Sequence, residues 1–83
     1  MVECNKYNAE GKKHGYWEEY YSNGNLMSKG YYKDGNREGY WESYHLDGNL
    51  RYKGWYKDGE PDGYWEKYHS NGNIWHKGYY VRM

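Results

Sequence analysis

Four histidines are the residues of this chain best suited to bind a metal ion. His45 and His69 recur at one position of a repeated unit, where Tyr21 stands in the first copy. The expected strands place these two histidines two strands apart, about 10 Å, which is too far for one ion. His69 and His76 are expected as diagonal neighbours at about 7–8 Å, but no cysteine or carboxylate completes a tetrahedral set. We therefore predict neither a metal site nor a cofactor, and we interpret the histidines as substitutes for Tyr21.

Three glutamates, Glu18, Glu42 and Glu66, are the candidates for general acid–base catalysis. Lysines flank each of them in the expected strand ladder and keep the carboxylates ionised. Recurrence in every copy suits a structural ion pair better than an active site, which needs asymmetry. Cys4 and His14 form the one conceivable nucleophile–base pair, but Cys4 lies outside the repeated units and no neighbouring charge would activate its thiol. We therefore predict no catalytic residues and a protein that is not an enzyme.

The aromatic side chains have the greatest capacity for binding, because fourteen tyrosines and five tryptophans make up 23% of the chain. Such rings stack on bases and sugars, and they are enriched at protein interfaces. The candidate binding residues, for a partner or a ligand, are Tyr16, Tyr31, Tyr40, Tyr44, Arg51, Trp55, Tyr64, Tyr68, Trp75 and Tyr79. The competing interpretation is that a small sheet uses tyrosine as its packing residue.

The composition restricts the fold and the partners of this chain. Its 83 residues make one small domain, in which aromatic rings must supply the buried area that scarce aliphatic residues do not. A net charge of zero leaves no basic field for a nucleic acid polymer or for an anionic membrane. One lone cysteine and the lack of a long apolar stretch predict no disulfide, no signal peptide and no membrane span. We therefore expect a cytoplasmic protein.

One unit of roughly 24 residues occurs three times in succession and must position all of these side chains. Each copy opens with Gly-Tyr-Trp-Glu and contains one Asn-Gly or Asp-Gly step between two runs rich in tyrosine and tryptophan. Such steps between aromatic runs are strong hairpin signals. We divide the single domain, 1–83, into a partial copy at 1–14 and copies at 15–38, 39–62 and 63–83.

The chain is predicted to be all-β, a single antiparallel meander of six to seven strands without a long helix. The expected strands are 15–22, 25–33, 39–46, 49–57, 63–70 and 73–81, with a further one at 2–8. With Asn23-Gly24 as a two-residue turn, Glu18 faces Lys29, Trp17 faces Gly30 and Tyr16 faces Tyr31. Opposite charges, and a ring beside a glycine, are favourable cross-strand pairs. A turn centred on Gly35-Asn36 would continue these rows by pairing Tyr31 with Tyr40, and one on Gly59-Glu60 would pair Trp55 with Tyr64.

The alternation of side chains sorts these rows onto two faces, which we call the tyrosine face (the side of Tyr16, Tyr40 and Tyr64) and the tryptophan face (the side of Trp17, Trp41 and Trp65). The tyrosine face is expected to add Tyr31, Trp55, Tyr79, the Glu/Lys ladder, Tyr20, Met27, Tyr44, Arg51, Tyr68 and Trp75. The tryptophan face is expected to add Gly30, Gly54, Gly78, Leu26, His45, Leu50, His69 and Ile74. We assign the core to the tryptophan face and the partner surface to the tyrosine face. The assignment reverses if the sheet curls the other way.

Three repeat positions differ strongly among the copies: Glu19, Ser43 and Lys67; Met27, Arg51 and Trp75; Ser28, Tyr52 and His76. A pure scaffold does not need such divergence, whereas a specific partner would exploit it. Drift at exposed positions explains the differences equally well.

The repeated unit resembles the MORN repeat (membrane occupation and recognition nexus) in its bacterial variant form. The stretches Tyr20 to Asn25 and Gly30 to Gly35 carry the resemblance, which covers nearly the whole chain in three consecutive copies. It implies a β-hairpin array with a binding role, in a family often labelled as antitoxins or immunity proteins and found on mobile elements and phages. It implies no catalytic residue. The chain has no excess of basic residues to attract acidic lipids, so we predict no membrane partner.

We expect a binding module that neutralises another protein, either a toxin or, for a phage-encoded inhibitor, a host defence enzyme. The alternative is a binder or sponge of a small nucleotide-like or sugar ligand, held by stacked Tyr and Trp rings with Arg51 or Lys53 near a phosphate. A single sheet leaves two faces and two edges uncovered. We therefore also expect a homo-oligomer, a dimer, unless the sheet curls on itself.

Overall fold

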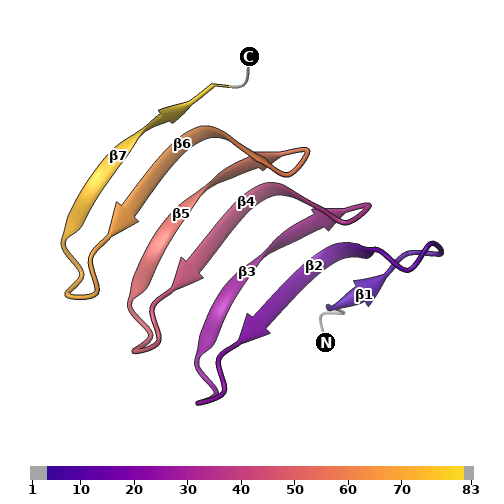
Figure 1. Cartoon of the computed structure of the whole chain (residues 1–83), viewed down its shortest axis with the longest axis horizontal. Coiled ribbons are helices and arrows are strands. Elements are labelled where there is room, and N and C mark those ends of the chain that lie inside the picture. Colours follow the sequence, from indigo (N-terminus) through magenta and orange to yellow (C-terminus); the bar gives the residue numbers. More distant parts are fainter. Residues whose placement is uncertain (1–3, 82–83) are drawn as a thin grey trace.

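The computed structural model describes residues 4–81 as one antiparallel sheet whose strands follow one another in chain order (Figure 1). The strands are β1 (Lys6–Tyr7), β2 (Lys13–Tyr20), β3 (Leu26–Lys33), β4 (Asn36–Tyr44), β5 (Leu50–Lys57), β6 (Glu60–Tyr68) and β7 (Ile74–Tyr80). The predicted all-β meander is confirmed, and the residues described contain no helix. The expected first strand, 2–8, is reduced to β1, and its residues 2 and 3 lie outside the described range.

The turns that carry Asn-Gly or Asp-Gly between β2 and β3, β4 and β5, and β6 and β7 are longer than predicted. In the first of them, the backbone N–H of Tyr21 donates to the carbonyl of Asn25 (2.9 Å) and that of Gly24 donates to the carbonyl of Tyr21 (3.0 Å). Gly24 adopts φ 92°, which favours glycine. The loop therefore holds three residues, 22–24, and the two-residue turn predicted at Asn23-Gly24 is wrong. The extra residue produces a bulge beside Tyr20.

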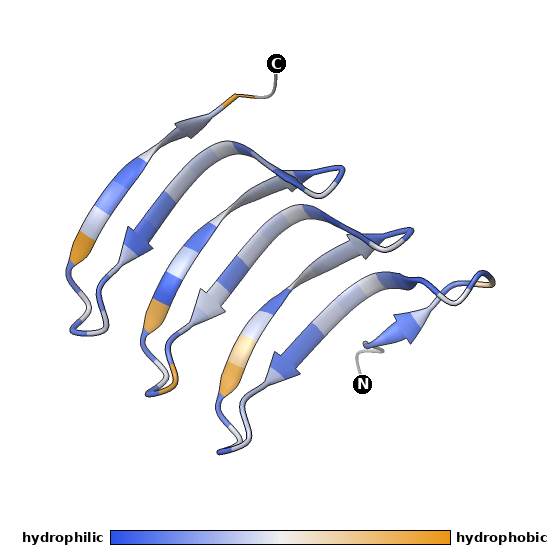
Figure 2. Ribbon diagram, viewed as in Figure 1, coloured by the Kyte–Doolittle hydropathy of each residue, from blue (hydrophilic) through white to orange (hydrophobic). Residues whose placement is uncertain are grey.

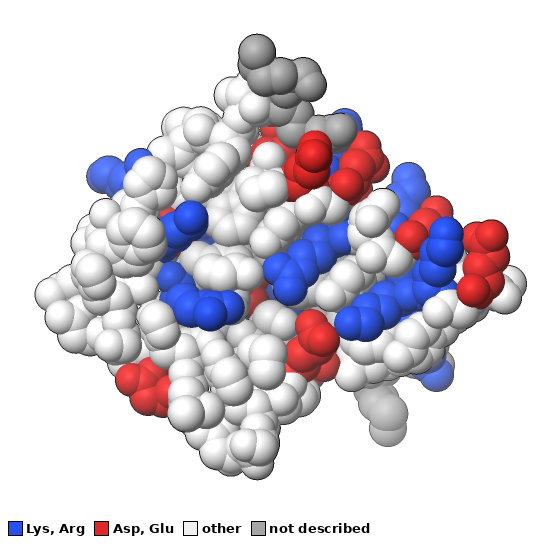
Figure 3. Space-filling model, viewed as in Figure 1, with Lys and Arg blue, Asp and Glu red and all other residues white. Residues whose placement is uncertain are grey.

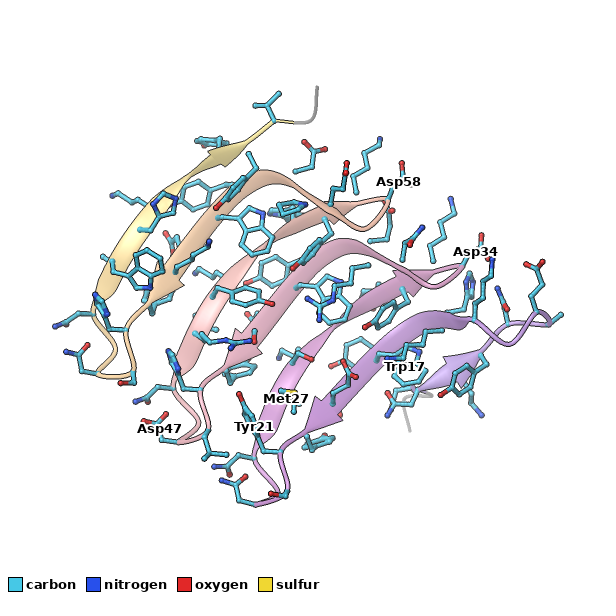
Figure 4. The ribbon with its side chains drawn as sticks, in the orientation of Figure 1. Trp17, Tyr21, Met27, Asp34, Asp47 and Asp58 are labelled. Carbon is cyan, nitrogen blue, oxygen red and sulfur yellow. The ribbon has the colours of Figure 1, made fainter. Side chains whose placement is uncertain are left out.

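The two-residue turns are instead Asp34-Gly35 and Asp58-Gly59, which lie at the tips of the opposite set of hairpins (Figure 4). Both residues of each turn have positive φ, at 50° and 87° in the first and 51° and 85° in the second. Such turns match the right-handed twist of paired strands. The predicted centres at Gly35-Asn36 and Gly59-Glu60 are therefore wrong by one residue.

The predicted register holds over most of each hairpin, and between copies it holds for Lys29 with Glu42 and Lys53 with Glu66 before it shifts toward the Asp-Gly turns. Glu18 faces Lys29, Trp17 faces Gly30, and the equivalent pairs recur in the later copies. Between β3 and β4, however, the ladder shifts beyond Lys29, so that Tyr31 faces Glu38 and not Tyr40. The same shift between β5 and β6 removes the predicted pairing of Trp55 with Tyr64, because Tyr56 faces Pro61. The continuous aromatic row is therefore divided into separate pairs.

The core lies on the tryptophan face, as predicted. Trp17, Trp41 and Trp65 are 7%, 1% and 3% exposed. The indole of Trp41 lies directly over Gly30, so that a Cβ at Gly30 would overlap the ring. Its N–H donates to the carbonyl of Tyr31 (3.0 Å), at the irregular point of the ladder. The ring thus packs on bare backbone and satisfies its one polar group in the same place.

The bulges next to the longer turns reverse part of the predicted face assignment. Leu26 pairs with Tyr20 and so shares the tyrosine face, and Leu50 and Ile74 follow the same pattern. These residues begin β3, β5 and β7, where Figure 2 shows the strongest hydrophobic colour. Met27, Arg51 and Trp75, predicted on the tyrosine face, are the extra residues of the bulges and turn to the tryptophan face. For Arg51 this is seen directly, because its Nη2 donates to Oγ of buried Ser43 (2.9 Å).

The sheet is a single curved layer with overall extents of 41 × 38 × 20 Å. No second sheet or helix covers either face within residues 4–81. Side chains on both faces are therefore available for binding. No helix of the described chain is long and apolar enough to cross a membrane.

Candidate binding surfaces

The tyrosine face is organised around three glutamates, each bridged by two phenols. Oη of Tyr16 donates to Glu18 at 2.7 Å, and Oη of Tyr20 donates to its other carboxylate oxygen at 2.6 Å. The same bridges are Tyr40–Glu42–Tyr44 and Tyr64–Glu66–Tyr68. Lysines join two of them across the strands, since Lys29 lies 3.4 Å from Glu42 and Lys53 lies 3.5 Å from Glu66. The prediction of a structural charge ladder therefore holds, with tyrosines as additional members.

These bridges fix the charge state of the tyrosine face. Burial alone would raise the pKa of Glu42, but hydrogen bonds from Tyr44 and Tyr40 together with the charge of Lys29 outweigh it and lower that pKa. Hydrogen bonds from Tyr20 and Tyr16 lower the pKa of Glu18 in the same way. Conversely, the bond to Glu66 is the main cause that raises the pKa of Tyr68 to about 12. At neutral pH the face therefore carries ionised carboxylates and neutral phenols held in one geometry.

This arrangement predicts an acid dependence of stability. Because the pKa of Glu42 is lower in the folded chain, its stabilisation is complete above the ordinary value of 4.5. It is lost as the pH falls through the lowered folded value. We expect Glu42→Gln to cost about 1 kcal/mol at pH 7 and to make the fall in the urea midpoint between pH 6 and pH 3 shallower. Glu10→Gln, an exposed turn position outside the bridges, is the matched control. An equally steep acid dependence in both variants would contradict the prediction.

Exposed rings lie beside each bridge. Tyr31, Trp55 and Tyr79 are 55%, 49% and 77% exposed. They pair with Tyr16, Tyr40 and Tyr64 at centroid distances of 5.4, 5.3 and 5.2 Å. Eight of the ten predicted binding residues therefore share the tyrosine face. The other two, Arg51 and Trp75, lie on the tryptophan face.

The tryptophan face carries basic side chains stacked on its buried rings. Nζ of Lys13 lies 4.8 Å from the ring centroid of Trp17, and Cζ of Arg37 lies 4.4 Å from that of Trp41. Figure 3 shows lysine and arginine side chains as a band across this face. Such contacts extend the thin core, because the long side chains cover rings that a single sheet would leave in water.

Arg37 also joins two phenols. Its Nη1 donates to Oη of Tyr52 (3.2 Å) and to Oη of Tyr56 (3.0 Å). Burial opposes the ionisation of Tyr52, but the hydrogen bonds from Arg37 and Tyr56 together with the positive charge of Arg37 outweigh it and lower the pKa of Tyr52. The pKa of Tyr56 is raised to about 12, first by burial and then by the neighbouring Tyr52. The guanidinium thereby holds both rings in place.

An open groove of about 510 Å³ crosses the C-terminal half of the tryptophan face. We call it the groove, and it is lined by His45, Arg51, Tyr52, Tyr56, Pro61, Trp65, Lys67, Tyr68, Trp75 and Tyr80. Three of the predicted binding residues line it: Arg51 and Trp75 on the tryptophan face, and Tyr68, whose hydroxyl donates to Glu66 on the opposite face. The other seven lining residues were not predicted as binding residues. The predicted register placed Arg51 and Trp75 on the opposite face, so the tryptophan face was assigned to the core alone. The sequence did contain one indication of the groove, because the repeat positions of Lys67 and Tyr52 hold a different residue in each copy.

The histidine position that recurs in the turns is structural. Nε2 of His45 lies 3.1 Å from the carbonyl oxygen of Tyr68, while Oη of Tyr21 donates to that of Tyr44 at 2.7 Å. Figure 4 shows Tyr21 reaching from its turn toward the next hairpin. Both side chains therefore tie one hairpin to the next. Within residues 4–81, no group of three or more His, Cys, Asp or Glu side chains could hold a metal ion.

The fold and its surfaces define a class of protein, a β-hairpin repeat protein in which one side-chain pattern recurs from hairpin to hairpin. The profile of the MORN repeat variant family matches residues 13–34, 37–59 and 61–82. This chain therefore belongs to the MORN repeat variant family. Comparisons with curated proteins and with solved structures gave no significant match.

Proposed function

We propose that this chain is a non-enzymatic module of bacterial or phage type that binds and neutralises another protein in the cytoplasm. The partner is a toxin or a host defence enzyme, and the tyrosine face is the surface that meets it. The observation that carries the proposal is the set of exposed rings on this face, at Tyr31, Trp55 and Tyr79. Tyrosine and tryptophan are enriched among the residues that dominate binding energy in protein interfaces.

Preorganisation supports this role for the tyrosine face. Three of the rings that pack beside the exposed ones, Tyr16, Tyr40 and Tyr64, are anchored through their hydroxyls to glutamates. Ordering mobile side chains on binding costs about 0.5–1.5 kcal/mol for each one. Rings that are already held in place avoid much of this cost, as in antibody paratopes.

The dimensions of the sheet also suit a protein partner. Extents of 41 × 38 Å exceed the footprint of about 800 Å² that each partner contributes to a standard interface. The same uncovered surface supports self-association, because a single sheet has no second layer. We therefore include a homodimer as the resting form in the absence of a partner.

The test begins with native mass spectrometry of the protein purified from its own host, which identifies a bound partner. We then expect Trp55→Ser and Tyr79→Ser each to weaken binding of that partner at least tenfold, since truncation of a ring that acts as a hot spot costs about 2 kcal/mol or more, roughly 30-fold in affinity. Leu46→Ser, which removes an exposed apolar side chain from a turn, is the control and should leave binding unchanged. Equal affinity of all three variants for the partner would contradict the proposal.

A further inference from the structure

The groove lies where the last copy lacks a basic side chain that the two earlier copies carry. The residue four positions before each core tryptophan is Lys13, Arg37 or Pro61. Lys13 and Arg37 lie over the tryptophans of their own copies, as described above. Pro61 carries no cation and instead lines the groove. Within the described chain no cation therefore stacks on Trp65; the ring of Tyr52 lies against it, and the groove opens beside this pair.

The charge of the groove differs from that of the first copy. Lys67 stands at the position of Glu19, which pairs with Lys13 at 3.4 Å. Within the described chain, neither Lys67 nor Arg51 forms an ion pair with a carboxylate. No aspartate or glutamate is among the residues that line the groove. Two basic side chains therefore face one open space in which no carboxylate of residues 4–81 pairs with them.

The groove also offers flat aromatic surface. Trp75 is 54% exposed, and Nζ of Lys67 lies 5.8 Å from its ring centroid. On the inner side, the ring of Tyr52 lies against that of Trp65 at 5.2 Å with an interplanar angle of 32°. The volume of about 510 Å³ is within the range of about 300–1,000 Å³ that is usual for small-molecule sites. The combination suits a small ligand with one planar ring and one anionic group.

We propose that the groove binds a free nucleotide, with its phosphate at Arg51 and Lys67 and its base against Trp75. A guanidinium matches the geometry of phosphate oxygens, and a base stacks well on an exposed indole. The site lies on the opposite face from the proposed protein-binding surface, so the inference does not depend on that function. A ligand here would bridge β5, β6 and β7, the strands that carry Arg51, Lys67 and Trp75.

The test is isothermal titration calorimetry of the full chain with AMP, GMP, CMP and UMP at low salt. We expect saturable binding of at least one of them at a single site. Removal of either half of that ligand, as the nucleoside or as ribose 5-phosphate, should weaken binding at least tenfold. Absence of saturable binding for all four nucleotides up to 1 mM overturns the proposal, and so does tighter binding of a short single-stranded oligonucleotide, which would assign the groove to a polymer.

Variants that restore the residues of earlier copies make the test specific. Lys67→Glu and Arg51→Met introduce the first-copy residues, and Pro61→Arg returns the covering cation. Each should weaken nucleotide binding at least tenfold, and Trp75→Ala should do the same without a change of charge. The control is Lys57→Glu, the same charge change at an exposed position outside the groove. The thermal midpoint of each variant shows that it is folded. Equal weakening by Lys57→Glu and Lys67→Glu would show non-specific attraction and overturn the proposal.

Discussion

Gly54→Ala should destabilise this protein by about 3 kcal/mol, at the upper end of the range for overpacked cores. A Cβ at Gly54 would lie far closer to Cδ2 and Cε2 of Trp65 than two such atoms can approach. The indole cannot move away freely, because its N–H donates to the carbonyl of Trp55 (2.9 Å) and Tyr52 packs against its ring. The strain must therefore spread into the backbone of β5 and β6. Small domains have little stability to lose. The urea concentration at the midpoint of unfolding should therefore fall close to zero.

Gly78→Ala is the matched control for this prediction, since Gly78 occupies the same repeat position in the last copy. No tryptophan lies over it, and the nearest atom to an added Cβ is Nε2 of His76 at 3.9 Å. We expect a change within about 1 kcal/mol, in the stabilising direction, because glycine weakens a strand interior. Urea unfolding followed by tryptophan fluorescence measures both variants. Equal destabilisation by the two substitutions would show that the indole does not rest on Gly54.

The sequence allowed this packing to be predicted because side-chain complementarity is local. Trp17 beside Gly30, and Glu18 beside Lys29, are favourable in one register only, and the same pairs recur with each copy. A slip of one residue would place a ring against a lysine. Three copies with the same complementarity therefore determine the order of the strands and the face that holds the core.

The bulges could not be predicted in the same way. Asn-Gly is compatible with a two-residue turn and with a three-residue loop whose glycine has positive φ. The loop chosen here is held by Asn25, whose N–H donates to Oδ1 of Asn23 (2.9 Å). One additional residue moves Met27, Arg51 and Trp75 to the tryptophan face. A difference of one residue in a turn was therefore enough to hide the groove from the sequence.

The two faces differ in how they use the repeat. The bridges of the tyrosine face are the same in each copy, because every copy keeps its glutamate between two tyrosines. On the tryptophan face, in contrast, the positions of Lys67, Arg51 and Tyr52 are occupied by different residues in each copy. A periodic surface suits contact over a wide area, whereas a combination that occurs once suits one small ligand. This contrast is why we assign the protein partner and the nucleotide to opposite faces.

Trp41→Ala should have the largest effect of any single substitution, about 3–5 kcal/mol. Trp41 is 1% exposed and lies edge-on to Tyr32 at 5.1 Å, under the guanidinium of Arg37. Its removal leaves a cavity in the centre of the sheet and leaves the carbonyl of Tyr31 without the indole donor. Trp55→Ala is the control, because that ring is 49% exposed on the tyrosine face and should cost about 1 kcal/mol.

A double-mutant cycle with Gly30 separates the loss of packing from a general weakening of the sheet. In the parent chain, Gly30→Ala forces a methyl group into the ring of Trp41 and should cost about 3 kcal/mol. In the Trp41→Ala background the same methyl group enters the vacated space, so its cost should fall below about 1 kcal/mol. Trimethylamine N-oxide, which favours the folded state, keeps the unfolding of the double variant measurable. Additive costs would mean that the ring and the glycine do not share one site. A Gly30→Ala cost that falls strongly in the Trp41→Ala background would show that the indole packs directly on the bare backbone of Gly30. The equivalent contact of Trp65 with Gly54 would then be expected to stabilise the sheet in the same way.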